Sequence, residues 1–438
     1  MAGKRLGSWR LAGAVWTWGV VAGLAVAAQD LTMFRGNEHR NLSAVGAVPR
    51  RAKIVWQLYV GGILEGQKEH RGVPPGTWWA GMGWTGQPAR VGDRYYLGSL
   101  NSYAYCLNAS TGEVIWRHKC GHSIKGSVNV YGDYLYFGCR DNRIRCLTKE
   151  NGALVWSREI GNDMDSSPLV VRNAVFAGGE DGWIYCFSAR TGDLYWRYRT
   201  EGSNETSPTW VDGRVYEGNS RGWLYCLRAG NGRLLWRLRT GDDTDSTPVY
   251  YGGCLYFGCE SGRFFCADAK TGKLAWSRKW PKGIWATPAV WNGRVYIGCA
   301  DGYMRCLDAG TGAELWKFRI PARIWSSAAV TDGCVVFGGG DGVVYCLDAQ
   351  AGKLVWKIAT GGYFLATPCV CRGQILIGNH NGWIYCIGED RGQPTRVLRD
   401  RPWPGVSDAW PLAVVRVGRA REDGRELAGS SGDARRSL

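Results

Sequence analysis

Proline, methionine and long apolar segments are all scarce in this chain. Its 438 residues include 15 prolines and 5 methionines, which excludes a collagen-like repeat and a proline-rich disordered chain. There is no Cys-x-x-Cys-His motif, so covalent attachment of a c-type haem is excluded. The longest apolar run, residues 11–26, has 16 residues, whereas a membrane-spanning helix needs about 20.

That apolar run has the features of a secretory signal. Lys4, Arg5 and Arg10 precede it, and Ala25-Val26-Ala27 satisfies the small-x-small cleavage rule. We therefore predict a signal peptide over residues 1–28, export to the periplasm or the extracellular space, and no transmembrane span after cleavage. An uncleaved anchor is the alternative. No cysteine follows the run, so the lipid attachment site of a bacterial lipoprotein is missing.

By contrast, glycine, tryptophan and cysteine are abundant, with 64, 24 and 16 residues. Much of this excess falls into columns that repeat every 40 residues. Two glycine columns run from Gly98 to Gly378 and from Gly112 to Gly392. The tryptophan column contains Trp116, Trp156, Trp196, Trp236, Trp276, Trp316 and Trp356, and the cysteine column contains Cys106, Cys146, Cys186, Cys226, Cys266, Cys306, Cys346 and Cys386. A fixed period of this length indicates a repeat architecture.

One unit, residues 166–196, contains four short apolar runs separated by turn signals, and it predicts four antiparallel strands. Units of this kind are typical of propeller blades. We predict an all-β, eight-bladed β-propeller over residues 53–390. The last repeat lacks its tryptophan, and the segment around Trp56 has the pattern of a fourth strand without the three before it. The N-terminal strand is therefore expected to complete the last blade.

Three other segments flank or interrupt this propeller. Residues 29–52 form a lead-in segment, and residues 61–84 form an insert of about 20 residues between two repeats. Residues 391–438 are basic, contain Gly and Ser and show no strand alternation, so they are predicted to be a mostly disordered tail.

The segments 107–116, 267–276 and 307–316 resemble the tryptophan-docking repeat of pyrroloquinoline-quinone (PQQ) type propellers. This resemblance implies either a PQQ- and Ca²⁺-dependent alcohol or sugar oxidoreductase or a non-enzymatic BamB-like assembly subunit. The dehydrogenases typically have two adjacent cysteines against the cofactor, but Val370 separates Cys369 from Cys371 here. We favour a non-catalytic scaffold that binds a protein partner in the cell envelope, with the PQQ enzyme as the alternative.

The column residues have structural interpretations. Each docking tryptophan is expected to bury its ring between blades. The column cysteines are too far apart to bridge one another and are expected to be small buried residues. Cys139/Cys146 and two similar pairs are predicted to be diagonal neighbours across a hairpin. The formal charge of +16 is spread over signal, tail and outer strands, so we expect no nucleic-acid partner.

The candidate functional residues are those that differ between equivalent positions. They lie in the loops that join the fourth strand of one blade to the first strand of the next. We predict a ligand funnel with an acidic half that holds Ca²⁺ or a cationic group and an aromatic half that stacks a planar ligand. A solvated ring of loops without a ligand is the other interpretation. The acidic half contains Asp163, Asp165, Glu205, Asp243 and Asp245, with Asp165, Glu205 and Asp245 as candidate Ca²⁺ ligands; the other half contains Trp285, Arg323, Trp325 and Tyr363, and Trp78 and Trp79 of the insert are expected to cover it.

Glu217 is a separate anomaly. Its column is otherwise apolar, so its carboxylate is predicted to be buried and paired, with an arginine as the favoured partner over catalysis or metal binding.

Overall fold

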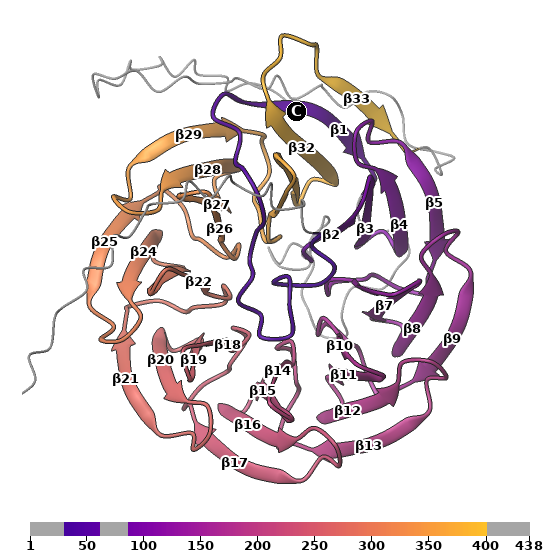
Figure 1. Ribbon diagram of the computed structural model, residues 1–438, viewed down its shortest axis with the longest axis vertical. Helices are drawn as coiled ribbons and strands as arrows, with labels where there is room; N and C mark the ends of the chain where they lie inside the picture. The colour runs from indigo at the N-terminus through magenta and orange to yellow at the C-terminus, as the bar shows by residue number, and fades with distance from the viewer. Residues whose placement is uncertain (1–29, 62–85, 401–438) are drawn as a thin grey trace, which may run out of the picture.

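The computed structural model describes residues 30–61 and 86–400. Eight sheets radiate from a central axis and form a closed ring (Figure 1). Seven of them, blades 1 to 7, have four antiparallel strands that run in chain order from the axis to the rim. The eighth blade combines strands from both ends of the described chain in the order β30-β31-β32-β1-β33. The predicted eight-bladed propeller, closed by an N-terminal strand, is confirmed.

The first four sheets after the insert have nearly identical strand lengths. Blades 1 and 2 contain β2 (Ala89–Val91), β3 (Arg94–Gly98), β4 (Tyr103–Asn108), β5 (Val114–Lys119), β6 (Asn129–Tyr131), β7 (Tyr134–Cys139), β8 (Arg143–Thr148) and β9 (Leu154–Glu159). Blades 3 and 4 contain β10 (Leu169–Val171), β11 (Ala174–Gly178), β12 (Trp183–Ser188), β13 (Leu194–Arg199), β14 (Thr209–Val211), β15 (Arg214–Asn219), β16 (Trp223–Arg228) and β17 (Leu234–Arg239).

The remaining sheets continue this pattern. Blades 5 and 6 contain β18 (Val249–Tyr251), β19 (Cys254–Gly258), β20 (Arg263–Asp268), β21 (Leu274–Lys279), β22 (Ala289–Trp291), β23 (Arg294–Gly298), β24 (Tyr303–Asp308) and β25 (Glu314–Arg319). Blades 7 and 8 contain β26 (Ala329–Thr331), β27 (Cys334–Gly338), β28 (Val343–Asp348), β29 (Leu354–Ala359), β30 (Cys369–Cys371), β31 (Gln374–Gly378), β32 (Trp383–Glu389), β1 (Ala52–Tyr59) and β33 (Arg396–Arg399).

The tryptophan and glycine columns hold neighbouring blades together. Trp156 Nε1 donates a hydrogen bond to the carbonyl oxygen of Ala189 in the next blade, at 3.0 Å. The Trp156 ring packs against Gly192, where a Cβ atom would lie 2.7 Å from the ring and where φ is +72°. Only glycine satisfies both conditions without strain. The ring-to-glycine contact recurs from Trp56 with Gly112 to Trp316 with Gly352, so the structural interpretation of both columns is confirmed.

The cysteine column lies directly opposite the tryptophan column. Cys186 pairs with Trp196 across β12 and β13, and an irregularity in the register follows immediately. The column cysteines are buried, and all sixteen cysteines are free. The predicted diagonal contact of Cys139 with Cys146 is wrong. Tyr136, not Cys139, pairs with Cys146. Cys139 is three positions after Tyr136, an odd number, so the two cysteines face opposite sides of the sheet.

Blade 8 contains one strand that the sequence did not predict. β33 lies within the predicted tail and pairs parallel to β1, with Trp56 opposite Arg396. Arg396 also forms a 2.5 Å ion pair with Glu113 of blade 1, and Asp400 forms a 2.6 Å ion pair with Arg117. The strand has only four residues, and its partners lie in β1 and blade 1, far away in the sequence. Local alternation of apolar and polar residues therefore could not predict it. Residues 401–438 of the predicted tail lie outside the described residues.

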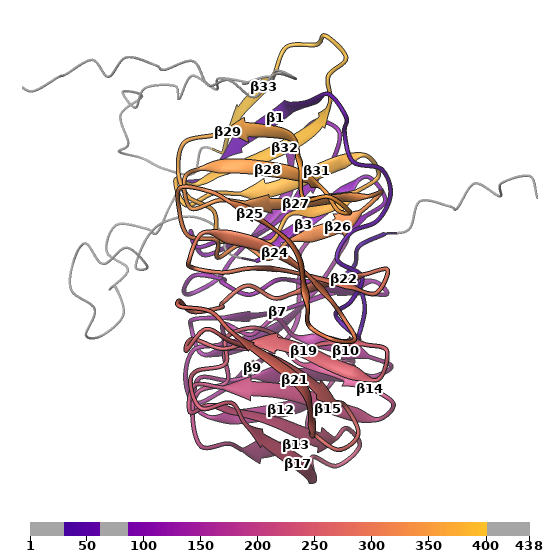
Figure 2. The ribbon, with the colours of Figure 1, turned by 90° about the vertical axis from the view of Figure 1, so that its left-hand side faces the viewer.

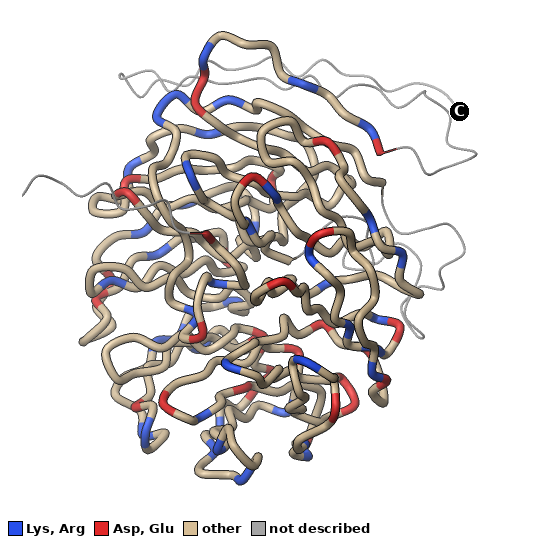
Figure 3. The backbone as a smooth tube through the Cα atoms, turned by 45° about the vertical axis from the view of Figure 1, so that its right-hand side comes forward, with Lys and Arg blue, Asp and Glu red and all other residues tan. Residues whose placement is uncertain are grey.

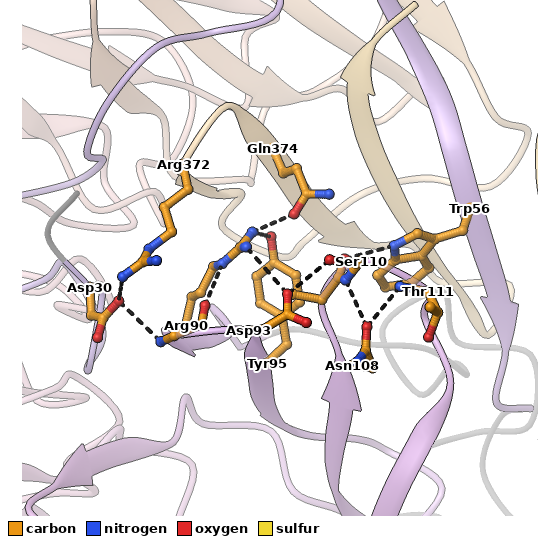
Figure 4. Close-up of polar contacts among 12 residues, drawn as sticks. Asp30, Trp56, Arg90, Asp93, Tyr95, Asn108, Ser110, Thr111, Arg372 and Gln374 are labelled. Carbon is orange, nitrogen blue, oxygen red and sulfur yellow. Dashed lines mark hydrogen bonds and ion pairs between the residues drawn. The ribbon is translucent and has the colours of Figure 1, made fainter. Parts of the chain in front are cut away.

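Polar contacts reinforce the seam between blades 1 and 8 (Figure 4). Arg90 of β2 donates hydrogen bonds to Gln374 of blade 8 and, at 2.9 Å, to the Tyr95 hydroxyl. Asp30 of the lead-in forms a 2.7 Å ion pair with Arg372. Trp56 Nε1 donates to the carbonyl oxygen of Ala109, at 3.0 Å. Closure therefore combines strand pairing, a docking tryptophan and buried polar contacts.

The lead-in segment crosses the centre of the ring and lies along one end of it (Figures 1 and 2). Its backbone forms hydrogen bonds with five inner strands, among them Leu31 with Arg90 of β2, Glu38 with Trp210 of β14 and Val45 with Val370 of β30. Arg35 and Arg40 are fully buried. Arg35 donates to the carbonyl oxygens of Ala328 and Pro288, and Arg40 donates to those of Pro208 and Ser167. Burial lowers the pKa of each arginine to about 9, so both remain charged at neutral pH.

Candidate functional site

The predicted funnel loops lie at one end of the ring, together with the turns between the second and third strands of each blade. Backbone hydrogen bonds join the two sets of segments: Glu180 N to Asp163 O at 3.0 Å, Glu260 N to Asp243 O at 2.8 Å and His380 N to Tyr363 O at 2.9 Å. A side chain in a loop therefore lies beside the side chain of a turn. The repeat places the turns at the same end of the ring as the loops, but the predicted candidate residues came from the loops alone. In the turns, Arg140, Glu180, Glu260 and His380 occupy equivalent positions 40 residues, or a multiple of 40, apart.

Two cations hold the most deeply buried acid of this group. Asp165 accepts a hydrogen bond from Lys125 Nζ at 2.5 Å and two from Arg140, at 2.9 and 3.0 Å. Burial alone would raise the pKa of Asp165, but the charges of Lys125 and Arg140 outweigh burial and lower it far below its usual value. Lys125 also lies 3.9 Å from Glu205, and Arg140 lies 3.7 Å from Asp163. Asp165 is therefore an ionised group that is already neutralised by its neighbours.

The other carboxyl groups are crowded together. Burial, together with Asp165 and Glu205, raises the pKa of Glu180 to about 9. Burial, together with Glu205 and Glu260, raises the pKa of Asp243 to about 7, and burial with the same neighbours and Asp243 raises that of Asp245 well above its usual value. Like charges at close range disfavour ionisation, so part of this acidic half is protonated at neutral pH.

The aromatic half is a continuous row of rings. Trp285 and Trp325 stack with centroids 6.0 Å apart and an interplanar angle of 18°. Trp325 contacts Tyr363 edge to face at 5.9 Å, and the Tyr363 hydroxyl lies 2.6 Å from His380 Nε2. The guanidinium of Arg323 lies 5.7 Å from the Trp325 ring centroid. The structure thus brings the predicted aromatic residues together with Arg323. Trp78 and Trp79, the predicted cover, lie outside the described residues.

The residues present do not fit the Ca²⁺ and quinone site that the family resemblance implies. Among the described residues, the carboxylates close enough to share an ion are Asp165, Glu180 and Glu205, rather than the predicted set with Asp245. Both oxygens of Asp165 are occupied by Lys125 and Arg140, which would compete with a cation. Cys369 and Cys371 are free thiols and not the adjacent disulfide of the dehydrogenases. No reaction step through a bound quinone can be derived from this arrangement.

Glu217 lies apart from the funnel, between blades 3 and 4. It is fully buried, and a Cβ atom on Gly178 would lie 1.8 Å from its Oε1 atom, so the carboxyl group fills the space that glycine leaves. The charge of Arg40 favours ionisation, but burial dominates and raises the pKa of Glu217 well above its usual value. Neither carboxyl oxygen has a hydrogen-bond partner within the described chain. The expected arginine is thus nearby, but it donates its hydrogen bonds to backbone carbonyls.

Within residues 30–61 and 86–400, no helix has the length and apolar character needed to cross a bilayer. The chain matches no curated protein significantly. Its fold resembles that of BamB from Moraxella catarrhalis, with 19% identity, a TM-score of 0.62 and coverage of 70% of this chain and 98% of that one. It also resembles a europium-containing methanol dehydrogenase, with 13% identity, a TM-score of 0.69 and coverage of 82% and 98%.

A third similar structure is the quinohemoprotein alcohol dehydrogenase from Comamonas testosteroni, with 14% identity, a TM-score of 0.68 and coverage of 84% of this chain and 82% of that one. At these identities the structural matches establish the fold alone. The family model described as outer membrane protein assembly factor BamB matches residues 42–159, 140–221, 220–321 and 300–397. The chain therefore belongs to this PQQ-repeat propeller family, PQQ_2.

Proposed function

We propose that this chain is an exported, non-catalytic scaffold that binds a protein partner in the periplasm or at the outside of the cell. The observation that carries the proposal is the ion-pair network around Asp165. A catalytic base or a Ca²⁺ ligand needs a carboxylate with a free oxygen, whereas Lys125 and Arg140 occupy both oxygens of this one. The family model named after an assembly factor supports the same function.

The contacts of the lead-in segment also support a scaffold. Arg35 and Arg40 of the lead-in donate hydrogen bonds to carbonyl oxygens of four blades, and the lead-in backbone crosses the centre of the ring (Figure 1). These contacts link blades that are not neighbours and so favour a rigid ring. Rigid faces lose little conformational entropy on binding, which favours recognition of another protein.

A PQQ-dependent oxidoreductase is the second candidate. Two observations favour it: the stacked pair of Trp285 and Trp325, and the approach of Asp165, Glu180 and Glu205 to one another. When bound, the quinone would supply the oxidising chemistry, and the stacked indoles are the side chains able to hold a flat ring system.

The two candidates differ in a direct measurement. The full chain is incubated with Ca²⁺ and PQQ, and absorbance and dye-linked alcohol oxidation are recorded beside a known quinoprotein dehydrogenase as the positive control. We expect neither stoichiometric PQQ binding nor turnover. Stoichiometric binding with turnover, both lost in Trp285→Ala, would overturn the scaffold proposal.

A further inference from the structure

The outer strand of every blade presents one long edge to the rim. Such edges carry unpaired backbone groups and pair readily with other strands unless charges, bulges or a covering segment protect them. In this ring the outer strands are β5, β9, β13, β17, β21, β25, β29 and, in blade 8, β1. Within the described chain, β1 alone among them has a further strand on its outer side, which is β33.

The three residues that follow each docking tryptophan show how these edges are protected. In the outer strands of blades 1 to 6 two of the three residues carry a formal charge. The charged pairs are Arg117 and Lys119, Arg158 and Glu159, Arg197 and Arg199, Arg237 and Arg239, Arg278 and Lys279, and Lys317 and Arg319. In β1 the equivalent residues, Gln57, Leu58 and Tyr59, are uncharged, and this is the edge that β33 covers. On this rim, an outer strand edge is therefore protected either by charged side chains or by an additional strand.

β29 has no covering strand within the described chain and has fewer charged residues than the outer strands of blades 1 to 6. Its three residues are Lys357, Ile358 and Ala359, so a single charge remains where six other outer strands have two. Ala359 is exposed and occupies the position of Arg199, Arg239 and Arg319 in other blades. Among the described residues, no strand lies outside β29. Figure 1 shows β29 at the rim, next to the blade in which β33 covers β1.

We propose that the edge of β29 is a docking site for an extended strand of a partner protein, in which apolar residues alternate with acidic ones. The backbone of β29 would supply the hydrogen bonds, and Lys357 would select an acidic residue on the incoming strand. The pairing of β33 with β1 is the precedent within this fold: four residues of extended chain add to an uncharged outer edge. The proposal rests on the scaffold function and names its binding surface.

Charge favours a partner strand over a second copy of this chain. β25, the outer strand of the preceding blade, carries Lys317 and Arg319 together with one acidic residue, Glu314, which lies 3.3 Å from Lys317. Figure 3 shows Lys and Arg interspersed with Asp and Glu along the chain. Two β29 edges facing each other would bring two copies of Lys357 close together, which costs free energy, whereas an acidic strand meets complementary charge.

The test uses the full chain and a fluorescein-labelled peptide of alternating valine and glutamate. Fluorescence anisotropy should report saturable binding. Ala359→Arg restores the residue of the equivalent blades at an exposed site and should weaken binding about tenfold or more, which corresponds to about 1.4 kcal/mol. The matched control, Ala359→Ser, should bind as the unmodified chain does. Lys357→Glu should lose the valine-glutamate peptide and gain a valine-lysine peptide.

Four outcomes would overturn the proposal. These are no saturable binding, equal binding by the unmodified chain and Ala359→Arg, binding that appears only after residues 401–438 are removed, and concentration-dependent dimerisation that Ala359→Arg abolishes. The third result would assign the edge to the chain's own C-terminal segment, and the fourth to a second copy. Each leaves the test with PQQ and Ca²⁺ unaffected, so failure of this site is distinguishable from failure of the scaffold function.

Discussion

Glu217 is a carboxyl group at a position where the other blades place apolar or aromatic residues such as Leu97, Phe137 and Ile297. Across the blade interface its Oε1 atom lies against Gly178, and Asn204 lies beside the same glycine. The structure supplies the charge of Arg40, but no hydrogen bond to either oxygen within the described chain. Because its pKa is raised, the folded protein holds this proton more tightly than the unfolded chain does.

Glu217→Gln should therefore change the pH dependence of stability. Between the ordinary carboxyl pKa and the raised one, the unmodified protein loses up to about 1.4 kcal/mol per pH unit relative to a non-titrating variant. We expect similar free energies of unfolding for both proteins at pH 4 and a more stable variant at pH 8. Urea denaturation followed by tryptophan fluorescence measures this difference. An equal difference at both pH values would contradict the raised pKa.

The residue scale also shows what the sequence could reveal about the candidate site. The acidic and aromatic loop residues were found because they break a column, and the structure places Trp285, Trp325 and Tyr363 in one row. Arg140 belongs to a different column, in the turns between the second and third strands; the propeller topology places these turns at the same end of the ring as the loops, but it does not show which turn residue contacts which loop residue. Its contact with Asp165 decides the chemistry of the acidic half, because it converts a candidate metal ligand into half of an ion pair.

At the scale of elements, periodic strands were predictable and β33 was not. A blade strand is predicted by its apolar residues and by its place in a repeat of 40 residues. β33 has four residues, of which Val397 and Leu398 are apolar, and its stability comes from contacts with β1 and blade 1. Leu398 packs against the cluster around Trp56, and Thr395 donates a 2.6 Å hydrogen bond to the carbonyl oxygen of Ile54.

Removal of β33 should weaken the closure of blade 8 without preventing folding. A chain that ends at Gln393 loses the parallel pairing, the ion pairs of Arg396 and Asp400 and the packing of Leu398. We expect a lower melting temperature and faster hydrogen exchange in β1, because β1 becomes an uncharged, uncovered edge.

A chain that ends at Asp400 is the matched control for this deletion, since it keeps the strand and both ion pairs. Its melting temperature and its exchange in β1 should equal those of the full chain. If the two truncated chains behave alike, β33 contributes nothing to closure.

At the scale of the whole molecule, the closed ring was predictable and the path of the lead-in across its centre was not. The last repeat lacks a fourth strand, and the segment around Trp56 has the pattern of a fourth strand without the three before it. Counting the strands of each repeat therefore predicted that the N-terminal segment closes the last blade. The lead-in has no repeat and no strand pattern, and its two buried arginines look like ordinary surface residues in the sequence. Their role depends on carbonyl oxygens supplied by blades 3, 4, 6 and 7, which no local pattern connects to them.

The lead-in and β1 should therefore behave as an integral part of the ring even when they are cut from it. A protease site introduced within residues 62–85 separates the segment 30–61 from the remainder of the propeller. We expect the N-terminal fragment to co-elute with the rest in size-exclusion chromatography after cleavage and to separate only in denaturant. Its strand is paired on both sides, and its arginines form buried hydrogen bonds whose loss would leave carbonyl oxygens unsatisfied. The same cleavage in an Arg35→Ala, Arg40→Ala variant should release the fragment at lower denaturant. Release from the unmodified chain under native conditions would show that the repeats close without the N-terminal segment.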